Sequence, residues 1–206
     1  MKVSICIPFY DEMPNSDFFL KRCLKSVEAQ SFKDYEIVIT TDKGGWAANH
    51  NAAIKKSQGE LIKFLHMDDF FYGEFALREI VGAFKGDWLV TGCIHYDGVQ
   101  YSNPHPAKYS QDIHTGNNTI GGPSVLTIKN DEPLLFDETL SWMVDCDYYK
   151  RLYDKFGEPT VLGSTTVVIG LHQGQATHLI PNEQKIKEVE YVKEKYDSSY
   201  DSSAKA

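Results

Sequence analysis

Two adjacent carboxylates, Asp68 and Asp69, are the clearest sign of chemistry in this sequence. They follow an apolar run, residues 61–65, that is typical of a buried strand. Side chains on a strand alternate between its two faces, so the two carboxylates have different roles open to them. Two negative charges about 4 Å apart repel by roughly 4 kcal/mol at an effective dielectric of about 20. A bound Mg²⁺ or Mn²⁺ would remove that cost; the alternative is a helix cap.

A second acidic pair, Asp145 and Asp147, opens a predicted helix. Carboxylates are favoured at the amino end of a helix because the backbone dipole is positive there, so simple capping is one interpretation. The other interpretation is a general base at Asp145 that takes a proton from a hydroxyl group.

Three further side chains follow predicted strands. Tyr10 could stack on a nucleobase or pack as an ordinary aromatic. Asp42 could accept from a nucleobase N–H or a ribose hydroxyl, or could belong to the turn that contains Lys43 and Gly44. His172 could bind a metal or a phosphate, a role for which the nearby His178 competes, or could be structural.

Tyr10, Asp42, Asp68 and Asp69 lie within the first 95 residues, where the sequence predicts alternating strands and helices. Apolar runs predict strands at 3–8, 35–40, 61–65 and 88–95, and helical periodicity predicts helices at 16–30, 46–57 and from about 74 to 86. Such alternation predicts an α/β sheet with right-handed crossovers. Ligands bind such sheets outside the carboxyl ends of the strands, where Tyr10, Asp42 and Asp68 fall.

The second half of the chain is less regular. We expect a long loop at 97–122, a strand at 124–128, a helix at 142–156, β-structure at 161–171, a charged helix at 182–196 and then a disordered tail. The pattern contains no internal repeat and no linker between domains. It predicts a single domain over 1–180, in two halves that divide near residue 96, followed by the charged helix and tail over 181–206.

Composition excludes several classes of function. The chain of 206 residues has a net charge of -8 and no basic stripe, which argues against a nucleic-acid partner. No run approaches the roughly 20 apolar residues that span a bilayer, so we expect no integral membrane segment. The short apolar start does not match a signal peptide, so a cytoplasmic location is predicted. Four scattered cysteines do not have zinc-site spacing, and Cys6 and Cys23 fit a reduced core.

The ordered set of motifs resembles the inverting family-2 glycosyltransferases, which have the GT-A fold. The resemblance covers residues 2–175. It is carried by KVSICIPFYDE at 2–12, QSFKDYEIVI at 30–39, NAAIKKSQGELIKF at 51–64, FDE at 136–138 and WMVDCDYYKRL at 142–152. It implies a Rossmann-like, mixed and mostly parallel sheet flanked by helices. The half before residue 97 would hold the nucleotide-sugar, and residues 97–180 would hold the acceptor and the catalytic base.

The resemblance also implies roles for individual residues. The implied donor nucleotide-binding residues are Pro8, Tyr10, Asp42, His50, Asn51 and Asp68. The implied ligands of a Mn²⁺ or Mg²⁺ cofactor are Asp68, Asp69 and His172. Asp145 corresponds to the catalytic base, and the implied acceptor contacts are Trp142, Gly121 and Gly122.

The implied reaction is the transfer of a sugar from a nucleotide-diphosphate sugar, often a UDP-sugar, to a hydroxyl of a glycan or lipid-linked acceptor, as in polysaccharide biosynthesis. Asp145 would deprotonate the acceptor, the hydroxyl would attack the anomeric carbon, and the cation would take up charge on the leaving diphosphate. A lipid-linked acceptor would bring the protein to the periphery of a membrane. The charged helix at 182–196 could join two copies in a homodimer or could remain solvated.

Several positions depart from the family pattern. His66 replaces the first aspartate of an Asp-x-Asp-Asp motif, Thr41 replaces an aspartate, His50 stands where arginine is frequent, and Val144 replaces a glutamate. These departures leave open a catalytically weak or inactive protein that binds nucleotide-sugars. A sugar-phosphate nucleotidyltransferase would need a Gly-rich loop after the first strand, and residues 9–14 do not supply one.

Overall fold

A single mixed sheet forms the centre of the computed structural model, which describes residues 2–203. Its strand order is β2-β1-β3-β7-β5-β8-β4, and β6 pairs with β5 outside this path. The strands are β1 (Val3–Pro8), β2 (Tyr35–Thr40), β3 (Leu61–Phe64), β4 (Phe70–Phe71), β5 (Trp88–Tyr96), β6 (Tyr101–His105), β7 (Leu126–Lys129) and β8 (Thr160–Gly170).

Most strands of the sheet point the same way. Strands β1, β2 and β3 are parallel, β7 runs against β3 and β5, and β8 is parallel to β5, so β1, β2, β3, β5 and β8 share one direction. Strands β4 and β6 run the other way. The carboxyl ends of five strands therefore meet at one edge of the sheet, as the sequence predicts.

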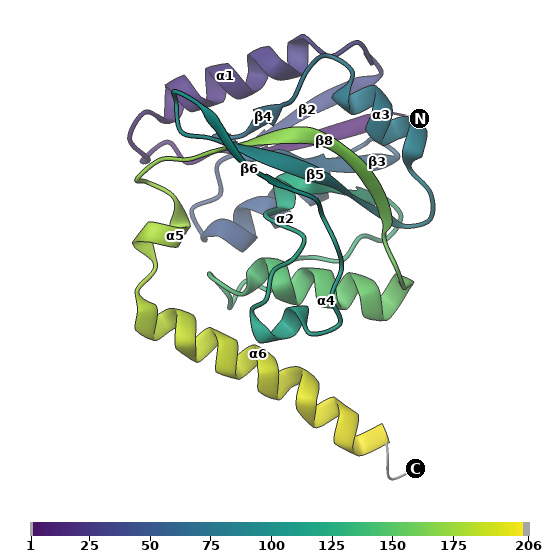
Figure 1. Ribbon diagram of the computed structural model, residues 1–206, viewed down its shortest axis with the longest axis vertical. Coiled ribbons are helices and arrows are strands. Elements are labelled where there is room, and N and C mark those ends of the chain that lie inside the picture. Colours follow the sequence, from purple (N-terminus) through teal and green to yellow (C-terminus); the bar gives the residue numbers. More distant parts are fainter. Residues whose placement is uncertain (1, 204–206) are drawn as a thin grey trace.

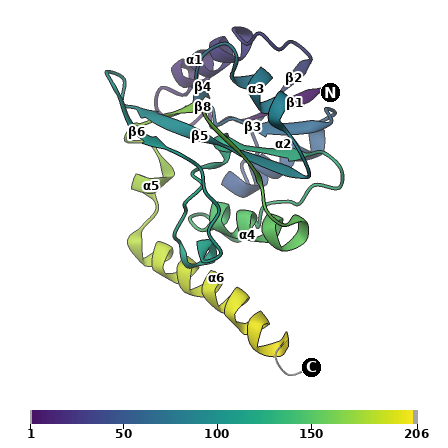
Figure 2. The ribbon, with the colours of Figure 1, turned by 45° about the vertical axis from the view of Figure 1, so that its right-hand side comes forward.

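Helices cover both faces of the sheet. They are α1 (Ser16–Glu28), α2 (Trp46–Lys56), α3 (Ala76–Ala83), α4 (Val144–Phe156), α5 (Ala176–Leu179) and α6 (Asn182–Ser203), with 3₁₀ turns η1 (Ile113–Thr115) and η2 (Pro123–Val125). Figure 1 shows α1 and α3 over one face and α2 and α4 over the other. Figure 2 shows α6 on the far side of α4, away from the sheet. No helix among the described residues is long and apolar enough to cross a membrane.

The core lies between the sheet and the two helical layers. All six residues of β1 and all four of β3 are buried, which fits their mainly apolar sequences. The exceptions are Ser4, which donates to Glu36, and Lys63, which donates to the backbone oxygen of Ser124. Strand β2 lies at the edge of the sheet and is half-exposed. The four cysteines are buried and free, in line with the prediction for Cys6 and Cys23.

The structure differs from the sequence-based prediction in several segments, among them the short strand β4, which the sequence pattern does not indicate. The predicted loop at 97–122 contains β6, which returns along β5 after a turn in which Asp97 Oδ1 accepts from the backbone N–H groups of Val99 and Gln100, both at 2.9 Å. The Asp97-Gly98 dipeptide is a hairpin signal that the prediction did not use. Helix α5 was not predicted. Helix α6 runs to Ser203 where we predicted a disordered tail, of which residues 204–206 lie outside the described part.

Candidate active site

The acidic pair and His172 meet at the edge of the sheet where the parallel strands end. Asp68 and Asp69 follow β3 and lead into β4, and His172 follows β8. The Nε2 atom of His172 lies 2.8 Å from Oδ2 of Asp68. Both side chains are largely but not fully covered, with exposed fractions of 13% and 18%. The structure therefore brings together two residues that the sequence predicts as metal ligands.

The charge of Asp68 is stabilised by its surroundings. Burial acts to raise the pKa of this carboxyl, but the hydrogen bond with His172 and the nearby His66 outweigh it, so the pKa is lowered. The guanidinium of Arg22 donates to the backbone oxygen of Asp68 and fixes the chain at this point. Asp68 is thus held as a carboxylate at neutral pH, the form that binds a cation.

Gly170 explains how β8 approaches Asp68 so closely. An added Cβ at Gly170 would lie 2.2 Å from the backbone oxygen of Asp68 and 2.6 Å from Nη2 of Arg22. No side chain fits between these groups, so only glycine allows the end of β8 to carry His172 to the acidic pair.

Asp69 points into the protein and has a different role from Asp68. Its Oδ1 accepts from the backbone N–H of Gly170 at 2.9 Å, and its Oδ2 accepts from the hydroxyl of Ser124. It is only 3% exposed. Burial and the neighbouring Asp68 raise its pKa well above the usual range. Asp69, predicted as a metal ligand, also ties β8 and η2 to the end of β3.

Two histidines, His50 and His66, form an edge-to-face pair beside the carboxylates, with 5.0 Å between ring centroids. Their Nε2 atoms are 3.1 Å apart, and Nδ1 of His50 lies 2.9 Å from the backbone oxygen of Trp46. Trp46 stacks on His50 with 3.9 Å between ring centroids. Burial, helped by the neighbouring His66, lowers the pKa of His50 well below its usual range, and burial also lowers that of His66. His50, predicted to contact the donor, lies behind His66 and is fully buried.

The residues at this edge fit a divalent cation. One ligand atom from each of His66, Asp68 and Asp69 lies within 4.8 Å of the others. A carboxylate beside imidazole nitrogens is a donor set that suits Mn²⁺ and related ions. His172 contacts this group through Asp68: its Nδ1 accepts from the backbone N–H of Gly174 at 3.1 Å, so its Nε2 carries the proton and donates to Asp68.

Asp145 lies in the first turn of α4, as predicted, and its environment fits a proton acceptor. Its Oδ1 is buried and has no hydrogen-bond partner. Burial raises the pKa of Asp145 to about 7. Asp147, in the same turn, is engaged instead: it accepts from Arg151 Nε, Lys195 Nζ and Tyr196 Oη, each at 2.7 Å. The two acidic residues at the start of α4 therefore divide into a free group and a structural one.

A short segment, residues 121–124, connects the acidic pair to α4. At one end the Ser124 hydroxyl donates to Asp69. At the other end the backbone oxygen of Gly121 accepts from Tyr149 Oη of α4 at 3.0 Å. Gly121 has a φ of +110°, which allows this bend. Gly121 and Gly122, predicted as acceptor contacts, thus lie between the acidic pair and the helix that carries Asp145.

Three predicted donor residues, Pro8, Tyr10 and Asp42, lie at or just after the ends of β1 and β2. Pro8 ends β1, and Tyr10 follows it with its hydroxyl 3.4 Å from the backbone oxygen of Trp46. Asp42 Oδ1 accepts from the Gly44 backbone N–H at 2.8 Å, as in a turn, and Asp42 also lines a hollow of ≈ 430 Å³ along α2. Asn49, which the sequence did not single out, joins the two ends by binding Phe9 and Asp42.

Asn51, predicted to contact the nucleotide, has a structural role. It is 1% exposed. Its amide nitrogen donates to the backbone oxygen of Phe136 at 2.9 Å and to Glu138 at 2.8 Å, and its oxygen accepts from the Phe136 N–H at 2.7 Å. All of these contacts hold the 136–138 segment on α2. Both polar atoms of the Asn51 side chain are therefore engaged in hydrogen bonds within the protein.

Glu188 of α6 lies at the amino end of α4 and was not foreseen. Its Oε2 accepts from the backbone N–H groups of Ser141, Trp142 and Met143, at 3.0, 2.7 and 3.0 Å. The carboxylate satisfies N–H groups that precede the helix and complements the helix dipole. Trp142, predicted as an acceptor contact, carries Lys185 over its ring at 4.4 Å. No local sequence signal links Glu188 to a helix more than 30 residues earlier.

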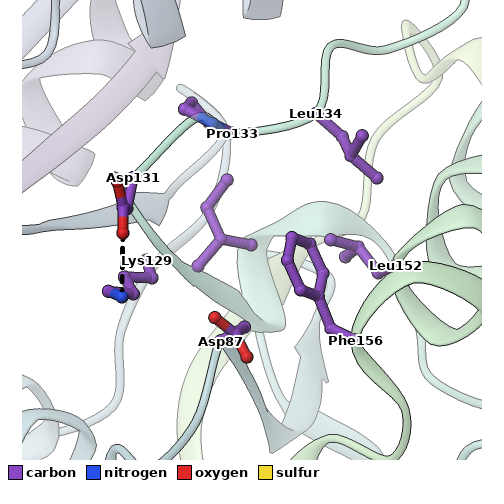
Figure 3. Close-up of a pocket in the computed structure, with 8 residues that line it drawn as sticks. Asp87, Lys129, Asp131, Pro133, Leu134, Leu152 and Phe156 are labelled. Carbon is purple, nitrogen blue, oxygen red and sulfur yellow. Dashed lines mark hydrogen bonds and ion pairs between the residues drawn. The ribbon is translucent and has the colours of Figure 1, made fainter.

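A separate pocket lies at the opposite edge of the sheet. Figure 3 shows it between the end of β7 and the carboxyl-terminal turns of α4, with Leu152 and Phe156 on one side and the Lys129–Asp131 ion pair on the other. Because Lys129 pairs with Leu61 at the start of β3, this pocket lies away from His66–Asp69 at the end of β3. It is therefore not part of the candidate site.

Comparisons with known proteins agree with this architecture. No protein-family model matches the chain. A poly(ribitol-phosphate) beta-glucosyltransferase of Bacillus spizizenii is 32% identical over 38% of this chain and 16% of that protein. An uncharacterized protein of Mycobacterium tuberculosis is 28% identical over 32% of this chain and 28% of that protein.

Solved structures of Staphylococcus aureus TarS have the same fold. TarS 1-349 in complex with UDP-GlcNAc matches with a TM-score of 0.69 at 19% identity, over 92% of this chain and 64% of that one. The complex with UDP matches with a TM-score of 0.62 at 19% identity, over 84% and 61%. The chain thus spans less than two thirds of each of these proteins. These similarities confirm the α/β fold class of GT-A type that the sequence predicts.

Proposed function

We propose that this chain is a glycosyltransferase that transfers a sugar from a nucleotide-diphosphate sugar to a hydroxyl group of an acceptor. The observation that carries the proposal is the contact of His172 with Asp68 at 2.8 Å, at the edge of the sheet where ligands of such folds bind. The similarity to a beta-glucosyltransferase and to a fold seen in complex with UDP-GlcNAc supports it.

A divalent cation, Mn²⁺ or Mg²⁺, is part of the proposal. Asp68 would hold it, with His66 and Asp69 close by, and His172 would orient the Asp68 carboxylate through its hydrogen bond. A cation bound there would supply positive charge to the leaving diphosphate. The lowered pKa of Asp68 supports this role because the carboxylate is charged throughout the physiological range.

Asp145 is proposed as the general base. A carboxylate with a pKa of about 7 accepts a proton more readily than an ordinary aspartate, yet is deprotonated in a large fraction of molecules at neutral pH. Its unpartnered Oδ1 is free to accept the proton of an acceptor hydroxyl. That hydroxyl oxygen then forms a bond to the anomeric carbon as the bond to the diphosphate breaks, which inverts the configuration.

UDP-sugars are the donors that we propose, with hexoses as the transferred sugars. Pro8, Tyr10 and Asp42 border the region proposed for the nucleotide, since they follow β1 and β2 at the same edge of the sheet. The acceptor would be a glycan or lipid-linked chain that passes Trp142, Gly121 and Gly122. The position of residues 121–124 between Asp69 and α4 supports this path.

The proposal is tested by ligand-dependent stability followed by a transfer assay. Thermal unfolding would be followed with UDP, GDP and CDP and their sugars, with Mn²⁺ and then with EDTA. A ligand that binds only the folded state adds RT ln(1 + [L]/Kd), about 2.7 kcal/mol at 100 Kd. A rise with one nucleotide that EDTA removes supports the donor site. If no nucleotide raises the thermal stability, the donor-site proposal is contradicted.

A second candidate is a protein that binds nucleotide-sugars without transferring them. The departures at His66, Thr41 and Val144 from the family pattern favour it. It predicts the same nucleotide-dependent stabilisation but no release of UDP from UDP-sugars, and no effect of Asp145→Asn on any measured rate.

A further inference from the structure

On the basis of the proposed donor site, we propose that His66 is itself a metal ligand through Nδ1, and that His50 is a positioning residue that fixes the orientation of its ring. His66 stands where the resembled family has an aspartate, so a nitrogen donor replaces an oxygen donor at this position. The inference rests on the hydrogen bonds of the two histidines, which determine where the protons lie.

The proton order follows from one backbone carbonyl. The oxygen of Trp46 can only accept, so Nδ1 of His50, 2.9 Å away, must donate. Nε2 of a neutral His50 must then accept from Nε2 of His66, at 3.1 Å. A neutral His66 carries a single proton, which this contact places on Nε2. Its Nδ1 therefore has a free lone pair.

That lone pair lies beside the carboxylates. Nδ1 of His66 is 3.9 Å from Oδ2 of Asp69, and the ligand atoms of His66, Asp68 and Asp69 are mutually within 4.8 Å. The gap between Nδ1 and the carboxylate oxygen leaves room for an ion that both contact, since metal–ligand bonds to nitrogen and oxygen are about 2 Å long.

Two further contacts position His66, one through its backbone and one through its ring. Its backbone N–H donates to Oγ of Ser124 at 2.9 Å, and the ring of Trp46 meets it edge-on at 5.5 Å. Outer partners of a ligating histidine fix its tautomer and orientation, and their loss typically weakens metal binding about 10–100-fold. His50 has the position of such a partner.

The consequence is a choice of metal. Nδ1 of His172 accepts from the backbone N–H of Gly174 at 3.1 Å, so its Nε2 carries the proton and donates to Asp68. The imidazole of His66, together with the Asp68 carboxylate, favours Mn²⁺, Co²⁺ or Zn²⁺ over Mg²⁺ and Ca²⁺, which prefer oxygen ligands. A site with aspartate at position 66 would discriminate less between Mn²⁺ and Mg²⁺. We therefore expect Mn²⁺ to bind at least tenfold more tightly than Mg²⁺, and His66→Asp to reduce that ratio.

The test uses Mn²⁺ binding, measured by electron paramagnetic resonance with and without UDP. Pulsed spectra of the unaltered protein should show a nitrogen coupling from one imidazole, which changes when histidine is labelled with ¹⁵N. His66→Asp should abolish this coupling. Circular dichroism and thermal melts establish that each variant is folded. If a variant does not fold, the spectrum of the unaltered protein by itself tests whether an imidazole nitrogen binds Mn²⁺.

His50 is tested by removal and by partial replacement. His50→Leu removes the acceptor for Nε2 of His66 and should weaken Mn²⁺ binding about 10–100-fold. His50→Gln keeps an acceptor oxygen and should recover part of the loss. The matched control is His114→Gln, because His114 lies on η1 and contacts Tyr196 and Asp197, away from the carboxylates.

The outcomes separate this inference from the proposed function. Nitrogen couplings that survive unchanged in His66→Asp, or a protein that does not bind Mn²⁺, overturn the role of His66. If UDP still stabilises the protein in that case, the proposed donor site stands without it. Conversely, an imidazole coupling that is lost in His66→Asp, without any nucleotide binding, supports His66 as a ligand and contradicts the glycosyltransferase proposal.

Discussion

The imidazole of His172 lies 2.8 Å from the carboxylate of Asp68, although 104 residues separate the two in the chain. The contact joins the end of β8 to the end of β3, and Gly170 makes the approach sterically feasible. It combines a charged oxygen and a nitrogen donor at the edge of the sheet. Predictions about this pair therefore bear directly on the donor site.

Removing either partner should abolish metal-dependent nucleotide binding. We expect Asp68→Asn and His172→Gln each to lose the thermal stabilisation that UDP and Mn²⁺ together give, which would be about 2.7 kcal/mol at 100 Kd. Each variant should melt within a few degrees of the parent without ligand, since both side chains are partly exposed. Full stabilisation by UDP and Mn²⁺ in both variants would exclude these residues as ligands.

Asp69 should matter for stability more than for metal binding. Asp69→Ala leaves the Ser124 hydroxyl and the Gly170 N–H without their partner, and each buried unsatisfied group costs about 1–3 kcal/mol. Urea unfolding should show this loss, whereas Asp68→Ala should not. Equal stabilities for the two alanine variants would contradict the division of roles between the carboxylates.

Asp145 should give the reaction a characteristic pH dependence. Its pKa of about 7 means that the base is protonated below that pH, so kcat/KM should fall about tenfold per pH unit on the acid side. Asp145→Asn should reduce kcat about 10²–10⁴-fold and leave UDP binding unchanged. A profile that is flat between pH 5 and 7 would argue against this base.

The same group should affect stability with the opposite sign. Between pH 4 and 7 folded Asp145 retains a proton that the unfolded chain has lost, so its contribution to the free energy of unfolding falls as pH rises through this window. Asp145→Asn lacks this titration. The melting temperature of the variant relative to the parent should therefore rise from pH 4 to pH 8, which calorimetry can measure.

Glu188 should stabilise the start of α4, the helix that carries Asp145. Glu188→Gln removes the negative charge that accepts from three backbone N–H groups and should lower the free energy of unfolding by about 1–3 kcal/mol. The control is Glu183→Gln on the same helix, which disrupts an exposed ion pair with Lys187 and should change stability by less than about 0.5 kcal/mol. Similar effects for the two variants would contradict the capping role.

The sequence alone determined the elements of the first half and the edge at which they act. Buried runs specify β1 and β3, and helical periodicity specifies α1 and α2, because these patterns depend on local spacing. The direction of parallel strands then places Tyr10, Asp42 and Asp68 at one edge. Strand β6 escaped the prediction because its residues, YSNPH, have no strand pattern and pair only through the hairpin with β5.

Only the tertiary structure decided which polar side chains face the site and which serve the fold. Asp68 and Asp69 are neighbours with the same chemistry, yet one meets His172 and the other meets Ser124 and Gly170. Asn51 fits a donor contact in sequence but is engaged with Phe136 and Glu138. Glu188 and the His50–His66 pair were invisible in the same way. These roles depend on contacts between segments far apart in the chain. Local residue patterns carry no information about which distant residue the fold brings into contact with a given side chain.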